Sequence, residues 1–169
     1  TVCPPGTYQP QAGQTICELC PLGFTCPDFG MVTATACPFG MVCDTPGLSI
    51  AKKPCPPGHY CLSGTETSDP NALSHLRPIP CPEGFYCSYG VVTNVSIAMN
   101  FSTPHPCTPG YFCSLGSETP HGQGPCPSGF ACSLSYPGKA QACPAGTFCP
   151  NTGNVEPKNC EPGSFNNQP

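Results

Sequence analysis

The residues of this chain that could do chemistry are almost all cysteines, 17 among 169 residues. Closely spaced thiols can bind zinc, exchange electrons or form structural disulfides. Cys17 and Cys20 have the Cys-x-x-Cys spacing of redox and zinc sites, but no βαβ pattern surrounds them and no second pair of this kind exists. The four histidines are scattered, at His59, His75, His105 and His121. We therefore expect structural disulfides, without a metal or a redox centre.

Catalysis is not indicated either. The linear sequence shows no Ser, His and Asp set, no phosphate-binding loop and no close pair of carboxylates. Catalytic groups also need a pocket that excludes water, which a thin stack of repeats does not provide. We expect the chain not to be an enzyme and to bind no cofactor.

Most of the cysteines belong to a repeated motif, Cys-Pro-x-Gly-x-x-Cys, which occurs seven times with one substitution. The copies are residues 20–26, 37–43, 55–61, 81–87, 107–113, 126–132 and 143–149. Half-copies begin at Cys3 and Cys160, with Gln9 and Asn166 in place of the second cysteine. Repetition every 17 to 26 residues predicts an elongated rod or solenoid-like stack of small units.

The motif also predicts its own local structure. Proline fixes one backbone dihedral and glycine permits a positive φ, which suits a tight turn that brings the two cysteines together. The 26 prolines and 19 glycines favour turns and short β-hairpins with little or no helix. The aromatic residue before the second cysteine is expected to pack as a minimal core, at Tyr60, Tyr86, Phe112 and Phe148.

Two disulfide frameworks fit the spacing. Five residues always separate the cysteines inside a motif, whereas the gaps between motifs vary from 10 to 19 residues. The constant interval favours local pairing, which gives Cys3 with Cys17, Cys20 with Cys26, Cys37 with Cys43, Cys55 with Cys61, Cys81 with Cys87, Cys107 with Cys113, Cys126 with Cys132 and Cys143 with Cys149. Cys160 is then unpaired or paired beyond the chain. A staggered framework, from Cys26 with Cys37 to Cys149 with Cys160, leaves Cys20 alone.

Composition places the protein outside the cell. Dense disulfides require an oxidising compartment, and the chain begins at Thr1 without a secretory leader, as a processed or partial chain would. Five basic and nine acidic residues give a net charge of -4, without the basic patch that nucleic acid needs. No apolar stretch is long and uninterrupted enough to insert into a membrane.

The opening of the chain resembles a known family. Cys3-Pro-Pro-Gly-Thr-Tyr, followed by Gly13 and Cys17-Glu-Leu-Cys20, is similar to the ephrin-receptor-like cysteine-rich repeat, a distant relative of tumour-necrosis-factor-receptor modules. The resemblance implies a Cys3–Cys17 bond. After Cys20 an additional inner cysteine departs from the family pattern. Long runs of such repeats look like those of extracellular matrix, cell-wall and flagellar-hair proteins of algae and protists, which implies a structural role.

The spacing divides the chain into segments. Residues 1–19 form the ephrin-receptor-like half unit, 20–61 and 107–159 form compact repeats, 62–106 form repeats with two long inserts, and 160–169 begin a further unit. In the second insert, residues 91–100 have the alternation of a β-strand. Its apolar face is the expected assembly face, with Val91, Val95, Ile97 and Met99, and the alternative is that this face packs within the chain on Phe85, Tyr86 or the preceding insert.

The polar face of that strand carries two N-glycosylation sequons, at Asn94 and Asn100. Threonines that precede proline are possible O-glycosylation sites or simple turn residues, at Thr45, Thr103, Thr108 and Thr119. Covalent glycans are expected to hydrate a surface that has few charges.

The sequence as a whole predicts a structural subunit of a secreted, glycosylated extracellular filament or matrix. Its expected partners are copies of itself or other matrix glycoproteins. The alternative is the stalk or ligand-binding ectodomain of a cell-surface receptor or adhesin. The expected location is the cell wall, the matrix or the flagellar surface.

Overall fold

The structure is a computed structural model, which describes residues 2–88, 104–133 and 139–165. The chain divides into two compact units. Unit 1 comprises Thr1–Ile79 together with Tyr89–Thr103, and unit 2 comprises Pro80–Ser88 together with Pro104–Pro169. Each unit is built from the same motif, and each is described by itself.

The described residues contain sixteen strands of two residues each and no helix. In chain order they are β1 (Thr7–Tyr8), β2 (Glu18–Leu19), β3 (Phe24–Thr25), β4 (Thr35–Ala36), β5 (Met41–Val42), β6 (Lys53–Pro54), β7 (His59–Tyr60), β8 (Ile79–Pro80), β9 (Phe85–Tyr86), β10 (His105–Pro106), β11 (Tyr111–Phe112), β12 (Gly124–Pro125), β13 (Phe130–Ala131), β14 (Gln141–Ala142), β15 (Thr147–Phe148) and β16 (Lys158–Asn159). Each odd-numbered strand pairs with the strand that follows it.

Each motif begins with a tight turn. In the second repeat of unit 1, the amide N–H of Phe24 donates a hydrogen bond to the carbonyl of Pro21, and Gly23 between them has a φ of 76°. A positive φ at this position defines a type II turn, in which glycine avoids steric strain. The corresponding bond and a positive-φ glycine recur in every described copy of the motif. The predicted role of proline and glycine is therefore observed.

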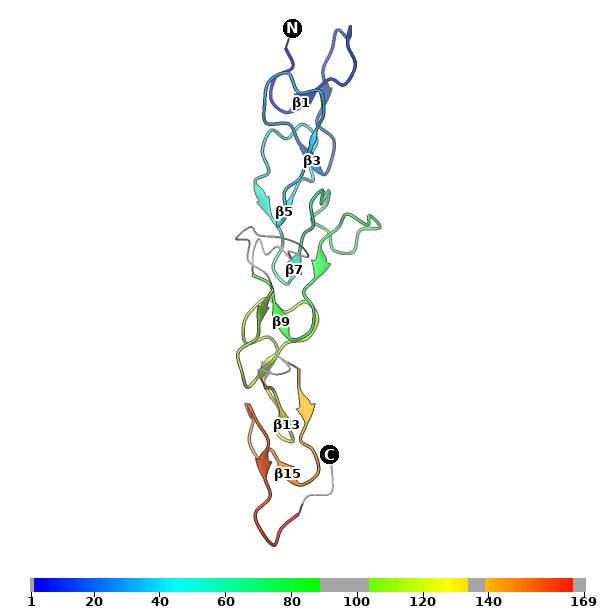
Figure 1. Ribbon diagram of the computed structural model, residues 1–169. Helices are drawn as coiled ribbons and strands as arrows, with labels where there is room; N and C mark the ends of the chain where they lie inside the picture. Colours follow the sequence, from blue (N-terminus) through cyan, green and yellow to red (C-terminus); the bar gives the residue numbers. More distant parts are fainter. Residues whose placement is uncertain (1, 89–103, 134–138, 166–169) are drawn as a thin grey trace. The chain divides into compact units, whose positions relative to one another are not determined.

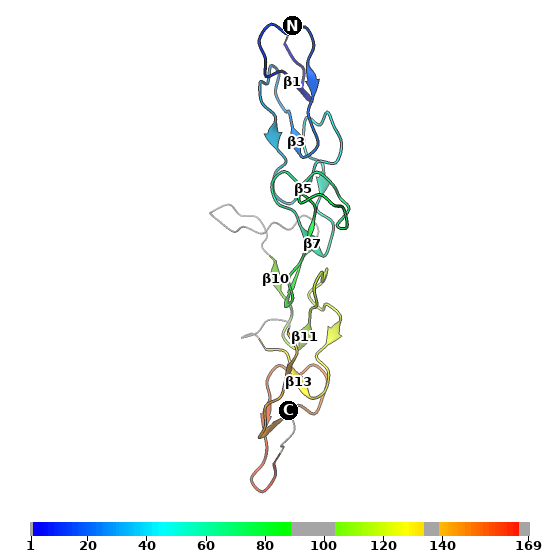
Figure 2. The ribbon, with the colours of Figure 1, turned by 90° about the vertical axis from the view of Figure 1, so that its right-hand side faces the viewer.

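A short hairpin connects each motif to the next. The last two residues before a closing cysteine pair with the two residues before the next opening cysteine, as when Phe24 lies opposite Ala36. In Figures 1 and 2, β1, β3, β5 and β7 follow one another along unit 1. The predicted fold class, a helix-free disulfide-rich repeat protein of short hairpins, is confirmed.

The structure pairs the cysteines locally. Seven disulfides close the seven motifs, and an eighth joins Cys3 to Cys17. This is the local framework, and no bond of the staggered framework occurs among the described residues. Consequently no disulfide connects one seven-residue motif to the next, and the repeats must hold together by other contacts.

Sulfur dominates the buried interior. The fully buried side chains are mainly half-cystines, together with Val42, Thr65 and Pro78. Val42 packs with Cys55 and Cys61 of the next repeat, and in unit 2 Ala131 packs with the next disulfide in the same way. The aromatic residues expected to form this core are only half-buried, except for Phe148, which is exposed. Val42 and Ala131 occupy the position of these aromatic residues, immediately before the closing cysteine, so the buried side chains at this position are the small ones.

A regular ladder of backbone hydrogen bonds joins successive repeats. Within each unit the glycine of a motif, called the motif glycine, donates its N–H to the closing cysteine of the next repeat, and its carbonyl accepts from the next opening cysteine. The first kind of bond runs from Gly6 to Cys26, Gly23 to Cys43 and Gly40 to Cys61 in unit 1, and from Gly84 to Cys113, Gly110 to Cys132 and Gly129 to Cys149 in unit 2.

A second set of glycines, called turn glycines, lies in the gaps after the closing cysteines. Each donates its N–H to the opening cysteine of the preceding repeat, namely Gly30 to Cys3, Gly47 to Cys20, Gly64 to Cys37, Gly116 to Cys81 and Gly153 to Cys126. Turn glycines also touch motif glycines two repeats away. A Cβ added at Gly6 would lie 2.5 Å from the carbonyl oxygen of Gly47, and one at Gly110 would lie 2.7 Å from that of Gly153.

Candidate functional site

The first insert, residues 62–80, is the part of unit 1 that departs most from the compact repeat. It projects sideways beside β7 in Figure 1. Two contacts anchor it to the stack. The hydroxyl of Ser63 donates to the carbonyl of Cys37 at 3.0 Å, and Ser68 bonds both Asp44 and Lys53. The insert is therefore held at its base and along its first half.

Asp44, Lys53 and Ser68 form a closed triangle of hydrogen bonds. The Lys53 ammonium donates to Asp44 at 2.5 Å and to Ser68 at 2.8 Å, and the Ser68 hydroxyl donates to Asp44 at 3.1 Å. Partial burial raises the pKa of Asp44, but the hydrogen bonds from Lys53 and Ser68 and the lysine charge together lower it below its ordinary value. The carboxylate form of Asp44 thus fixes the insert.

The outer half of the first insert is organised by its own hydrogen bonds. The amide N–H of Glu66 donates to the carbonyl of Leu76 at 3.0 Å, and the hydroxyl of Ser74 donates to the Glu66 carboxylate at 2.5 Å. The Arg77 guanidinium donates to the carbonyl of Ala72 at 2.8 Å. These bonds close the loop upon itself, so its tip has a defined conformation.

Side chains alternate along this tip. Ala72, Ser74 and Leu76 are half-buried, whereas the residues between them point to solvent, at Asn71, Leu73, His75 and Arg77. Leu73 is completely exposed. The tip therefore displays a bare aliphatic side chain, and the bond from Arg77 to Ala72 holds a guanidinium close to it. Arginine is enriched among the residues that contribute most to binding at protein interfaces.

Unit 2 contains an open apolar hollow of about 330 Å³. Its walls are Phe148, Cys160, Glu161, Ser164 and Phe165. Ser164 is fixed by hydrogen bonds to the carbonyl of Glu161, whereas the Glu161 carboxylate has no partner among the described residues. The hollow therefore combines two aromatic walls with one available negative charge.

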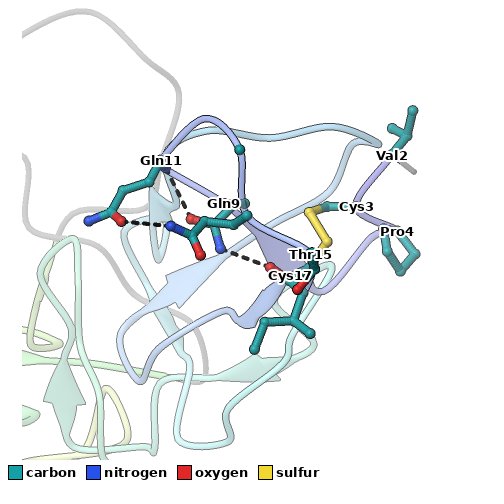
Figure 3. A pocket seen from close by; sticks show the side chains of 10 residues that line it. Val2, Cys3, Pro4, Gln9, Gln11, Thr15 and Cys17 are labelled. Carbon is teal, nitrogen blue, oxygen red and sulfur yellow. Dashed lines mark hydrogen bonds between the residues drawn. A yellow bond between two sulfur atoms is a disulfide. The ribbon is translucent and has the colours of Figure 1, made fainter.

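Unit 1 contains a more polar cavity of about 620 Å³ inside the Cys3–Cys17 loop. Figure 3 shows how its amide side chains are connected. Gln9, which occupies the position of the missing second cysteine, donates to the carbonyl of Ile16 at 2.8 Å, and Gln14 donates to Gln11 at 3.2 Å. Gln9 thus closes by hydrogen bonds the half-motif that lacks its own disulfide.

Four of the remaining predicted site residues lie in the described part of the chain, and each is partly or fully exposed. Cys160 is a free, partly buried thiol. Thr45 and Thr119 are exposed and Thr108 is half-buried. Thr103, the sequons Asn94 and Asn100, and the assembly face, Val91, Val95, Ile97 and Met99, lie outside the described residues. Two of the histidines contact aromatic rings, His105 with Tyr86 and His121 with Tyr111.

Sequence reasoning missed two features. The first is the set of turn glycines, whose signal is present as a glycine three or four residues after several closing cysteines, for example Gly30 after Cys26. The second is the exposed tip of the first insert. Its length marked it as distinctive, but only the hydrogen bonds from Glu66 and Arg77 reveal which side chains point outward.

Within residues 2–88, 104–133 and 139–165, no group of three or more His, Cys, Asp or Glu side chains is placed to hold a metal ion. Over the same ranges, no helix has the length and apolar character needed to cross a membrane.

Comparison with known proteins identifies the N-terminal segment. Residues 1–37 match the family model described as tyrosine-protein kinase ephrin type A/B receptor-like. This is the segment whose cysteines suggested the resemblance, so the ephrin-receptor-like repeat is confirmed for residues 1–37. The rest of the chain is a cysteine-rich array in which seven further motifs or parts of motifs follow, with paired cysteines up to Cys149. No curated protein matches the chain. The module type and the eight disulfides indicate an extracellular location.

Proposed function

We propose that this chain, whose first 37 residues form an ephrin-receptor-like module, is a structural subunit of a secreted, glycosylated extracellular filament or matrix. The observation that carries this proposal is the hydrogen-bond ladder between repeats. Gly23, for example, donates to Cys43 at 2.9 Å and accepts from Cys37 at 2.7 Å. Such a ladder makes each repeat a binding surface for the next one.

A structural role agrees with the way in which disulfides and backbone hydrogen bonds are distributed along the chain. Disulfides close each small loop, the ladder connects neighbouring loops, and motif glycines contact turn glycines two repeats away. Each repeat therefore touches mainly its neighbours, as in other repeat proteins that act as spacers and scaffolds. Nothing in this arrangement requires a cofactor, and we infer a non-enzymatic role.

Covalent sugar is part of the proposal. A surface with so few charges needs another source of hydration, and Thr45 and Thr119 are exposed beside prolines. Asn94 and Asn100 would add N-linked glycans on one face of the second insert. The opposite face of that predicted strand, which includes Val95 and Ile97, remains a proposed contact with another part of the assembly.

Sedimentation and negative-stain electron microscopy test the proposal directly. The protein should be produced in a secretory host, so that its disulfides and glycans form, and studied over a range of concentrations. We expect sedimentation coefficients that rise with concentration and regular filaments on the grid. A chain that stays monomeric at all concentrations would contradict self-assembly.

The alternative function is the stalk or ligand-binding ectodomain of a receptor or adhesin. It is favoured by the description of the matched family, which refers to a receptor, and by the ordered first insert with its exposed Leu73. A monomer in the sedimentation experiment, together with saturable binding to cells that is lost on changing Leu73, would favour this alternative.

A further inference from the structure

We propose that the tip of the first insert of one copy docks into the Phe148–Phe165 hollow of a second copy. Leu73 would enter between the two aromatic rings, and Arg77 would pair with Glu161. This inference rests on the proposed function, because it names one contact through which copies assemble.

The tip has the properties of a preformed docking group. Leu73 is completely exposed, yet the loop beneath it is fixed by the bonds of Glu66 with Leu76 and Ser74. The Arg77 guanidinium is held beside Leu73 by Ala72, and its other N–H groups have no partner among the described residues. Binding would therefore require little ordering of the loop, which lowers the entropic cost of association.

The hollow offers the complementary chemistry. Phe165 is largely exposed and Phe148 is partly exposed, so both rings have apolar surface that water now covers. A hollow of about 330 Å³ accommodates one branched aliphatic side chain. Glu161 lines the same hollow, and within the described part of the chain its carboxylate has no partner, so its charge complements the guanidinium beside Leu73.

Charge supports the choice of partner. The chain has five basic residues in total, and Lys53 is already engaged by Asp44. Arg77 is one of the other four basic residues and lies beside the fully exposed Leu73, and Glu161, whose carboxylate has no partner among the described residues, lies beside exposed aromatic rings. Apolar burial together with an opposite-charge pair fixes both affinity and orientation.

The contact would be heterologous, because the tip and the hollow are different surfaces. A heterologous contact whose rotation does not close produces an open chain of copies. Each copy would offer its tip to one neighbour and its hollow to another. The proposed contact can therefore continue from copy to copy, as a filament requires, whereas a two-fold dimer needs the same surface on both copies.

The free thiol of Cys160 lines the hollow and provides a built-in probe. In the variant Leu73→Cys, docking would bring the introduced thiol close to Cys160 of another copy. Diamide would then oxidise the two thiols to one disulfide, itself taking up the two electrons and two protons. We expect a ladder of multimers on a non-reducing gel and a cross-linked peptide pair containing positions 73 and 160, identified by mass spectrometry.

The matched control is Leu115→Cys, because Leu115 is another well-exposed leucine and lies outside the tip. We expect at least tenfold less cross-linking to Cys160 in this control, and none in Leu73→Cys combined with Cys160→Ser. Equal cross-linking from positions 73 and 115 would overturn the proposal, because it would indicate random collision. A bond between positions 73 and 160 within a single chain would also overturn it.

Charge reversal provides a test without new cysteines. Arg77→Glu and Glu161→Arg should each reduce assembly of the otherwise unaltered chain at least tenfold, and the two changes combined in one chain should restore it. If the unaltered protein forms filaments that none of these variants affects, the docking contact is wrong while the proposed function stands. If the unaltered protein never assembles, the proposed function itself fails.

Discussion

Replacement of Gly23 by alanine tests the stacking of repeats most sharply. Gly23 has a φ of 76°, and a Cβ there would lie 2.5 Å from the carbonyl oxygen of Gly64, two repeats away. The positive φ alone costs alanine about 1 to 2 kcal/mol. Because the clash is with backbone, the stack must also shift, which adds roughly 1 to 3 kcal/mol as overpacking. We expect a total destabilisation of about 2 to 5 kcal/mol.

Two glycines serve as controls for this prediction. Gly129 occupies the same position in its motif as Gly23 and has a φ of 84°. Gly13 lies in the same unit as Gly23 and has a φ of 80°. At both sites an added Cβ would meet nothing within 4 Å. Alanine at these positions should cost only the backbone term, about 1 to 2 kcal/mol.

Native-state hydrogen exchange is the appropriate assay, because a repeat array need not unfold in a single step. The amide N–H groups of Cys37 and Gly64, which join the ladder around Gly23, should lose most of their protection in Gly23→Ala. They should change little in Gly129→Ala. Equal loss of stability in Gly23→Ala and in both controls would refute the idea that glycine contacts across two repeats hold the stack together.

Three further predictions concern the covalent and ionic groups. Full reduction and alkylation should abolish protease resistance and change the circular dichroism, since closing each six-residue interval is worth about 2 kcal/mol; unchanged signals would contradict this. Exchange protection of the first insert should be complete above pH 3.8 and be lost as the pH falls through the lowered pKa of Asp44, and Asp44→Asn should remove this dependence. Glycopeptide mass spectrometry should find sugar on both Asn94 and Asn100, and bare asparagines would remove the argument for a glycan-covered face.

The fold was largely predictable because its determinants are local in sequence. Cys37, Gly40 and Cys43 lie within one short motif, so their spacing already limits the turn and the disulfide. The composition of the core was less predictable. The aromatic residues were expected inside, but they are at most half-buried, whereas Val42 and the half-cystines are fully buried. Val42 packs on the Cys55–Cys61 disulfide of the next repeat, a contact that the spacing of the motifs does not reveal.

The candidate site depends on contacts between distant positions, which a single sequence does not reveal. Spacing alone marked the first insert as unusual. It did not show that Ser68 would bond Asp44, 24 residues earlier, or that the hydroxyl of Ser63 would reach the carbonyl of Cys37. These tertiary bonds anchor the first half of the insert to the stack, and they arise only after the repeats have stacked.

The contacts that hold the stacked repeats together also indicate at which positions the amino-acid sequence can vary. Cysteines are required for the core, motif glycines for the type II turn and the close approach, and turn glycines for the ladder. The third residue of each motif meets none of these requirements, and it is leucine at position 22, phenylalanine at 39 and serine at 128, with all three exposed. Surface properties can therefore change at this position and in the inserts without loss of the stack. Differences in recognition between one repeat and another are therefore expected at this position, in the inserts and in the incomplete last unit, since the repeated backbone presents the same hydrogen-bonding groups at each step.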